Sequence, residues 1–267
     1  TRTADAGEMR TSVPPGPARW NDLGRRVSPS VLTPGGPLQG RTDRNAASFG
    51  GKRTALVVFV STGPVVGAAS RQEEVDSIRL HPDLTAATFV SRPNRFVAIT
   101  ICEGRETVAH VANSGRLAEL LHPDNPVYLA PASVGRNRKT AYDLSLVEVD
   151  GVLVSADARL PNTLVHEAIT DGRLPQFVAY TDVRREVVFG DSRLDLLLTG
   201  GDGSCFMEMK SVTLVTGGTG LFPDSPTERG RKHLRSLLAA VRAGHRGVVV
   251  FVVQRPDAEV FAPNERA

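Results

Sequence analysis

The sequence predicts an α/β protein, α+β overall, in which a small all-β domain precedes a mixed-sheet α/β domain. Two changes of pattern predict this order. Short strand-like runs separated by turns begin near residue 80, and a succession of helix, strands, helix and strand begins near residue 156. We therefore divide the chain into residues 1–79, left unplaced as a disordered or extraneous leader, residues 80–155 and residues 156–267.

The leader has a composition that does not favour a folded core. Residues 1–53 are rich in Pro, Gly, Ser, Thr and Arg and show no sustained period. Such a segment buries too little apolar area to offset the entropy of ordering it. The run TALVVFVST at 54–62 predicts a short strand, much shorter than the ~20 residues of a membrane-spanning helix. Since no signal-peptide pattern is present either, we expect a soluble, cytoplasmic protein that does not enter a membrane.

The all-β domain is predicted from strand-like runs with Gly, Asn or Pro between them. These runs are LTAATFVSR (84–92), RFVAITICEG (95–104), TVAHVAN (107–113), NPVYLAPAS (125–133) and AYDLSLVEVDG (141–151). Short strands at this close spacing are typical of a small β-barrel or an open sheet. The segment GRNRKT at 135–140 adds a loop with a basic tip.

The α/β domain is predicted from changes of hydrophobic period. A helix is expected over 160–174 and another over 228–244, with strands at 186–190, 192–200, 205–215 and 246–255. The last strand is a continuous apolar run of the kind that is buried on both faces. The glycine-rich segment at 216–220 predicts a mobile loop beside a cleft.

Charge and cysteine content narrow the function only slightly. The net charge is +3 and the isoelectric point about 9.1, with more Arg than Lys, which mildly favours a polyanionic partner such as nucleic acid. Cys102 and Cys205 lie far apart in apolar runs. We therefore expect neither a disulfide framework nor a zinc cluster, in keeping with a reducing compartment.

One group of charged residues suggests chemistry. On a strand, Glu208 and Lys210 share a face, and Asp195 lies on the face opposite Leu194, Leu196 and Leu198. If the two polar faces coincide across the hairpin, the two carboxylates and the lysine converge. Carboxylates at one point repel each other unless a divalent cation such as Mg²⁺ or Mn²⁺ lies between them, as in phosphodiester hydrolysis. The alternative is an ordinary cross-strand ion pair on a solvated face.

Several longer segments resemble the sugar fermentation stimulation protein family, SfsA. In the C-terminal half they are RREVVFGDSRLDLLL, MEMKSVTL, LFPDSPTERGRKHLRSL, AGHRGVVVFVVQRPD and FAP; upstream they are RPNRFVA, VANSGRL, SLVEVDG and LPNTLVHEAI. The resemblance runs from about residue 80 to the C-terminus. It implies an OB-like β-barrel, then a domain similar to PD-(D/E)xK nucleases. It also implies DNA binding and a role in regulating sugar utilisation.

Carried over residue by residue, the resemblance gives a candidate active site. Asp195, Glu208 and Lys210 match the nuclease-like core as catalytic residues, with Asp195 and Glu208 as ligands of Mg²⁺ or Mn²⁺. Glu186 is a further candidate ligand, or else a surface carboxylate paired with Arg184 or Arg185. The chain departs from the family pattern at Met209, and it stops at FAPNERA where the family continues, so we expect a C-terminal truncation.

Basic and polar side chains are the candidate DNA contacts. In the barrel they are Arg92, Arg95, Asn113, Arg116, Arg136, Arg138 and Lys139, and in the second helix Arg229, Lys232 and His233. For any one helix residue, a solvated face is the alternative. Because aromatic residues make up only 5% of the chain, we expect phosphate contacts rather than base stacking.

Three functions are compatible with these patterns. The first is a metal-dependent DNA nuclease, and the second is a non-catalytic DNA-binding regulator of sugar utilisation genes. The third is a structural interaction protein in which the basic loops are incidental. The sequence leaves open whether the chain forms a homodimer.

Overall fold

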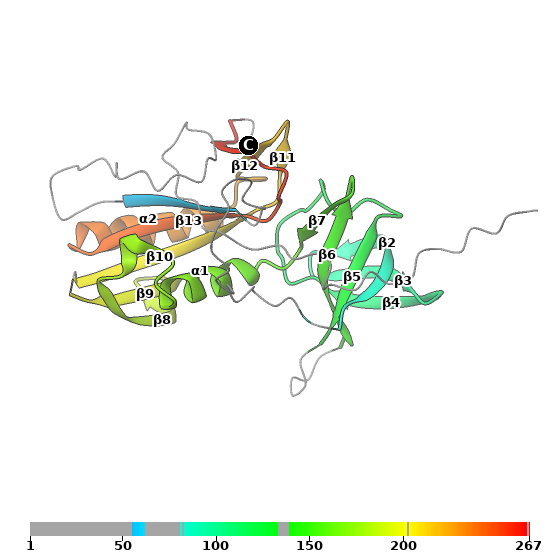
Figure 1. The fold of residues 1–267 in the computed structure, drawn as a ribbon, viewed down its shortest axis with the longest axis horizontal. Coiled ribbons are helices and arrows are strands. Elements are labelled where there is room, and N and C mark those ends of the chain that lie inside the picture. The colour runs from blue at the N-terminus through cyan, green and yellow to red at the C-terminus, as the bar shows by residue number, and fades with distance from the viewer. Residues whose placement is uncertain (1–54, 62–80, 82, 133–138, 202, 266) are drawn as a thin grey trace, which may run out of the picture.

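The computed structural model describes residues 55–61, 81, 83–132, 139–201, 203–265 and 267 (Figure 1). The described chain forms two lobes, a β-barrel and a mixed α/β lobe, with the helix α1 (Leu160–Thr170) running from the barrel into the second lobe. The predicted fold class, an OB-like β-barrel followed by a mixed-sheet α/β domain, is confirmed. Among the described helices, none is long and apolar enough to cross a membrane.

The first lobe is a closed barrel with one added strand. Its strands are β2 (Thr85–Asn94), β3 (Val97–Cys102), β4 (Arg105–His110), β5 (Pro126–Pro131), β6 (Tyr142–Val149) and β7 (Val152–Ser155). They follow the order β4-β3-β2-β5-β6-β7, and a parallel pairing of β4 with β6 closes β4, β3, β2, β5 and β6 into a ring. This closing pairing is short and joins Ala109 to Tyr142 and His110 to Asp143.

Alternation along the strands separates the barrel core from its surface. On β3, Ala98 and Thr100 are fully buried, whereas Ile101 is 38% exposed. The β3–β4 hairpin turns at Glu103 and Gly104, whose φ angles of 50° and 72° are those of a type I′ turn. Local patterning of this kind explains why the strands could be predicted from the sequence.

The second lobe is built on a mixed five-stranded sheet with the order β1-β13-β10-β9-β8. The strands are β1 (Ala55–Ser61), β8 (Tyr180–Phe189), β9 (Ser192–Gly200), β10 (Gly203–Val212) and β13 (Arg246–Val253). β13 is parallel to both β1 and β10, whereas β9 is antiparallel to β8 and β10. The short strand predicted at 54–62 thus extends this sheet beyond β13.

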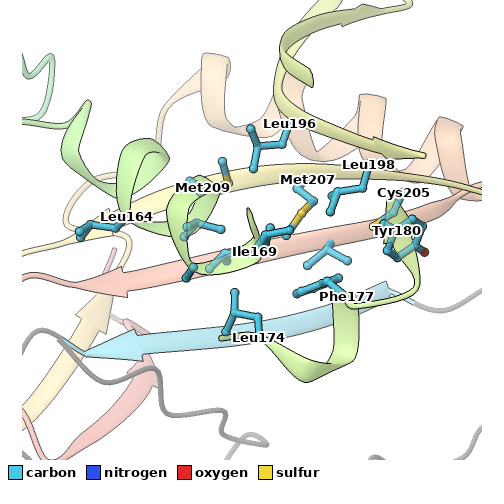
Figure 2. Close-up of a cluster of buried hydrophobic side chains, with 14 of the residues drawn as sticks. Leu164, Ile169, Leu174, Phe177, Tyr180, Leu196, Leu198, Cys205, Met207 and Met209 are labelled. Carbon is cyan, nitrogen blue, oxygen red and sulfur yellow. The ribbon is translucent and has the colours of Figure 1, made fainter. Parts of the chain in front are cut away.

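Two helices cover opposite faces of this sheet. α1 packs Leu164 and Ile169 on the face that carries Leu196, Met207 and Met209, together with the short 3-10 helix η2 (Pro175–Phe177) (Figure 2). α2 (Glu228–Arg242) packs Leu237 and Ala240 on the other face. Both faces are covered, which agrees with the apolar run of β13 from Gly247 to Val253 that the sequence predicts.

A second, three-stranded sheet replaces the loop that was predicted around residues 216–220. β11 (Val215–Thr216) and β12 (Thr219–Phe222) form a hairpin, and β12 pairs with β14 (Val260–Pro263). Gly217 and Gly218 take φ angles of 54° and 74°, so this glycine pair forms a tight hairpin turn. The prediction of a mobile loop was wrong because the pairing partner, β14, lies some forty residues further along the chain.

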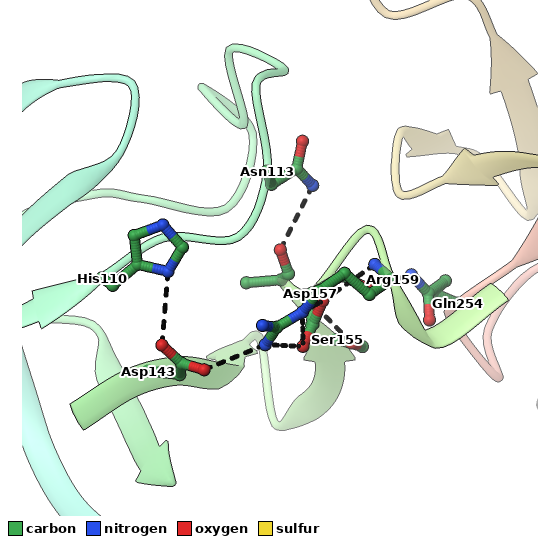
Figure 3. A network of polar contacts seen from close by, with 8 residues as sticks. His110, Asn113, Asp143, Ser155, Asp157, Arg159 and Gln254 are labelled. Carbon is green, nitrogen blue, oxygen red and sulfur yellow. Dashed lines mark hydrogen bonds and ion pairs between the residues drawn. The ribbon is translucent and has the colours of Figure 1, made fainter. Parts of the chain in front are cut away.

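Polar contacts join the two lobes (Figure 3). In the barrel, Nδ1 of His110 lies 3.2 Å from Oδ1 of Asp143, and Oδ2 of Asp143 accepts a 3.0 Å bond from Arg159. Arg159 also binds the carboxylate of Asp157, whose carbonyl accepts a 3.5 Å bond from Gln254 at the end of β13. Arg159 directly precedes α1, so the network fixes the start of this helix beside the barrel.

Candidate active site

The candidate site lies where β9 and β10 separate. Their ladder runs from Gly203 opposite Gly200 to Met207 opposite Leu196 and ends there. Beyond that point the N–H of Met209 donates a 2.7 Å hydrogen bond to Oδ2 of Asp195. A side-chain carboxylate therefore replaces a backbone acceptor, which brings Asp195 to the edge of β10.

Strict alternation on β9 fails at this fork. Leu196 and Leu198 pack on the α1 face as predicted, but Leu194 packs with Leu197 and α2 on the other face. The predicted common face for Leu194, Leu196 and Leu198 was therefore wrong for Leu194. The reason is that β9 pairs with β10 only from Leu196 to Gly200, whereas the residues before Leu196 pair with β8 alone.

Glu208 is a buried carboxylate on the α2 face of β10, only 3% exposed. Its Oε1 accepts a 2.5 Å hydrogen bond from Nζ of Lys210 and also contacts Nδ1 of His233 from α2. Its Oε2 is buried and has no hydrogen-bond partner among the described residues. A buried acceptor without a partner is costly, so this oxygen marks a position where a ligand would be accommodated.

The pKa of Asp195 is raised by its surroundings, which include the charge of Glu208. Burial and, next, the negative charge of Glu208 raise the pKa of Asp195 to about 6, although hydrogen bonds from Met209 and Asn162 and the charge of Lys210 act against the rise. The two carboxylates are thus close enough to repel each other. This repulsion favours a cation between them.

Two further residues hold these carboxylates. One was predicted from the sequence in another role, and the other was missed. His233, expected as a DNA contact, contacts Glu208, and its side chain is only 12% exposed. Asn162, in the first turn of α1, was missed; its Nδ2 donates a 2.8 Å bond to Oδ1 of Asp195. An uncharged amide at a helix start gives no local signal, and only its place in the segment LPNTLVHEAI could have drawn attention to it.

The donor set fits a hard divalent cation that keeps part of its water. No group of three or more His, Cys, Asp and Glu side chains forms a protein metal cage in the part of the chain that the structure describes. Asp195 and Glu208 supply carboxylate oxygens, the ligands that Mg²⁺ and Mn²⁺ prefer. Mg²⁺ in particular is held by one or two carboxylates, with water and substrate phosphate completing its shell.

Glu186 stands apart from this cluster. Its side chain is 61% exposed and forms a 3.2 Å ion pair with Arg193, neither of which fits a shared ligand position with Asp195 and Glu208. The sequence alternative, a surface carboxylate, describes it better, although the partner is Arg193 rather than Arg184 or Arg185. Arg184 instead lies 3.4 Å from Asp182.

Two of the expected DNA contacts in the barrel hold the backbone instead. The guanidinium of Arg92 donates to the carbonyls of Arg95, Asn113, Gly115 and Arg116. Asn113 is 9% exposed; its amide donates to the carbonyl of Ala156 and its Oδ1 accepts from the N–H of Gly115. Both side chains therefore form hydrogen bonds that stabilise the loops of the barrel.

The other expected contacts divide into exposed and undescribed residues. The exposed ones are Arg95, Arg116, Lys139, Arg229 and Lys232. Arg136 and Arg138 lie outside the described residues. The exposed set remains available to a ligand of opposite charge.

Both lobes match known families. Residues 90–156 match the family described as "SfsA N-terminal OB domain", and residues 159–267 match "Sugar fermentation stimulation protein RE domain". A sugar fermentation stimulation protein homolog of Moorella thermoacetica is 51% identical over 189 residues, which are 70% of this chain and 82% of that protein. A homolog of Desulforamulus reducens is 47% identical over 183 residues, 68% of this chain and 76% of that protein.

A solved structure agrees with these matches. It is the structure of Pyrococcus furiosus SfsA in complex with Ca²⁺, which is 31% identical with a TM-score of 0.64 and covers 74% of this chain and 82% of that chain. Sequence and fold therefore give the same assignment across both lobes. The chain belongs to the sugar fermentation stimulation protein family, SfsA.

Proposed function

We propose that the second lobe hydrolyses phosphodiester bonds in DNA with Mg²⁺ or Mn²⁺ held by Asp195 and Glu208. The observation that carries this proposal is Oε2 of Glu208, a buried carboxylate oxygen without a partner among the described residues. An ordinary structural ion pair would leave both oxygens either bonded or solvated. Asp195, whose pKa is raised by burial and by the charge of Glu208, supplies the second carboxylate.

A divalent cation suits both the residues and the family. Bound there, it would stabilise the negative charge on the phosphate oxygens and make a bound water more acidic. The structure of the Pyrococcus furiosus relative is in complex with Ca²⁺, a hard cation that also takes oxygen ligands. This supports a hard divalent cation in the family without fixing which one acts here.

The surrounding residues have separate roles in this proposal. Lys210 uses one donor on Glu208, and its side chain is 15% exposed, so its remaining N–H groups can hold a water or a phosphate oxygen at the site. His233 and Asn162 are positioning residues that fix Glu208 and Asp195. Because Glu208 is almost fully buried, these interactions act in a medium that screens them less than water does.

DNA is the proposed substrate because of the charge outside the site. The exposed basic residues of the barrel and of α2 suit a phosphate backbone, and the family description of the barrel as an OB domain agrees with a nucleic-acid partner. Contacts of this kind bind with little preference for sequence.

Cleavage assays on single- and double-stranded DNA test the proposal. The parent chain should cut DNA with Mg²⁺ or Mn²⁺ and not with EDTA, and Glu208→Gln and Lys210→Ala should each lower the rate by about 100-fold or more. Glu228→Gln, an exposed carboxylate on α2, is the matched control and should cut like the parent. Tight DNA binding without any cutting would support the non-catalytic regulator instead.

A further inference from the structure

The barrel presents two arginines on two loops that the side chain of Arg92 holds together. The Arg92 guanidinium binds the carbonyls of Arg95 at 2.6 Å, Asn113 at 2.8 Å, Gly115 at 2.9 Å and Arg116 at 2.5 Å. The backbones of Arg95 and Arg116 therefore meet at one point, although they lie in different loops. Both of their side chains are exposed, and we call them the barrel arginine pair.

The loop that carries Gly115 and Arg116 lies against the segment that leads into α2. A Cβ placed on Gly115 would lie 3.4 Å from Oδ2 of Asp224, so the side chain of Asp224 lies close to the backbone of Gly115. Asp224 lies three residues before Thr227. The hydroxyl of Thr227 caps α2 by accepting a hydrogen bond from the N–H of Gly230. We call this contact between Gly115 and Asp224 the seam.

The seam leads to the candidate active site along α2. From Thr227 to His233, which contacts Glu208, the helix extends about 9 Å. Arg229 and Lys232 lie on this first part of α2, and both are exposed. Exposed cations thus stand on the barrel side of the seam and on the α2 side.

The exposed cations near the seam differ from other surface arginines in their ion pairing. Within the described residues, no ion pair involves Arg95, Arg116, Arg229 or Lys232, whereas Arg231 pairs with Glu228 at 2.7 Å. Exposed basic side chains on both sides of the seam suit a ligand that carries several negative charges, which is the chemistry of a polynucleotide backbone.

We infer that the barrel arginine pair binds backbone phosphates of the same strand that enters the site at Glu208, so that one nucleic-acid strand spans both lobes. The inference rests on the proposed function for what happens at Glu208, but it assigns the substrate as a polynucleotide several nucleotides long. Arg92 supports the pair without touching the strand, because its two Nη groups donate to carbonyls and its Nε is buried.

Binding of a fluorescent single-stranded 20-mer in EDTA tests this surface without any cleavage. In the Arg95→Ala, Arg116→Ala double variant, affinity should fall about tenfold, and the slope of log K against log salt should flatten by about 1.4, or 0.7 for each lost phosphate contact. The variant keeps Arg92 and the carbonyls it binds, so its thermal unfolding midpoint should match the parent.

The matched control is Arg105→Ala, which also removes one exposed charge from the barrel. Arg105 lies at the other end of the six-residue strand β3 from Arg95, roughly 20 Å away, and should leave affinity within about twofold. If the double variant binds no more weakly than Arg105→Ala, the inference is overturned. If it binds weakly but the parent never cuts DNA, the surface stands and the proposed nuclease function fails. If the parent cuts DNA but the double variant binds as tightly as Arg105→Ala, the proposed nuclease function stands and the inference about the barrel arginine pair fails.

Discussion

Nζ of Lys210 lies 2.5 Å from Oε1 of Glu208, two residues earlier on the same face of β10. Their side chains are 15% and 3% exposed, so this is not the solvated surface pair that the sequence alternative describes. Burying an ion pair costs desolvation, and such a pair adds to stability only when its hydrogen bonds are complete. Because Oε2 of Glu208 is unpartnered among the described residues, the pair fits a ligand site better than a stabilising contact.

Loss of the His233 contact should weaken cation binding through the orientation of Glu208. In His233→Ala, Glu208 keeps Lys210 as its donor but can turn, so Mn²⁺ affinity should fall about tenfold in isothermal titration calorimetry. His233→Asn, which can still donate from a similar position, should recover part of the loss. Leu234→Ala changes an exposed neighbour on α2 and should bind Mn²⁺ like the parent; equal affinities for all three variants would contradict a positioning role.

The raised pKa of Asp195 should make the stability of the cation-free protein depend on pH. The native state keeps the Asp195 proton up to about pH 6, whereas the ordinary pKa is 3.8. The native state therefore binds more protons between these values, and the stability contributed by this carboxyl is lost as the pH rises through about 6. In urea unfolding with EDTA, the parent should lose up to about 3 kcal/mol relative to Asp195→Ala between pH 4 and pH 7. A flat difference would contradict the raised pKa and therefore the burial of Asp195 beside Glu208.

Arg92 should matter for stability rather than only for DNA. Arg92→Lys keeps the charge but cannot reach the same set of carbonyls in a planar fork, so the free energy of unfolding should fall by about 1–3 kcal/mol. Arg95→Ala removes an exposed side chain next to it and should change stability by no more than about 0.5 kcal/mol. Urea unfolding that gave equal losses for both would show that the Arg92 hydrogen bonds contribute little.

Much of the fold could be predicted because its determinants are local. Periodicity within the segment is enough to predict alternating strands such as β3, the helix α1 and the apolar run of β13. The hairpin of Gly217 and Gly218 was missed because its stability depends on β14, a distant partner. The arrangement of Arg92 likewise depends on carbonyls more than twenty residues away along the chain, and a sequence does not show such contacts.

The candidate site could be predicted only in part for the same reason. Strand parity brought Glu208 and Lys210 together, and the family resemblance singled out Asp195. The fork that turns Asp195 toward Met209 breaks parity, and the contacts of Asn162 and His233 come from two helices on opposite faces of the sheet. The residues of each helix do not show which strand residue its polar side chains will meet.

Titration of Mn²⁺ into the cation-free parent and into Glu208→Gln is the most direct test of the site. The substitution keeps the size of the side chain and removes the charge that a cation needs. The account predicts saturable binding by the parent that weakens by more than about tenfold in Glu208→Gln, whereas Glu228→Gln, on an exposed side chain, binds like the parent. If the parent binds no Mn²⁺, or if Glu208→Gln binds it equally well, Glu208 is not a ligand and the proposed metal site is contradicted.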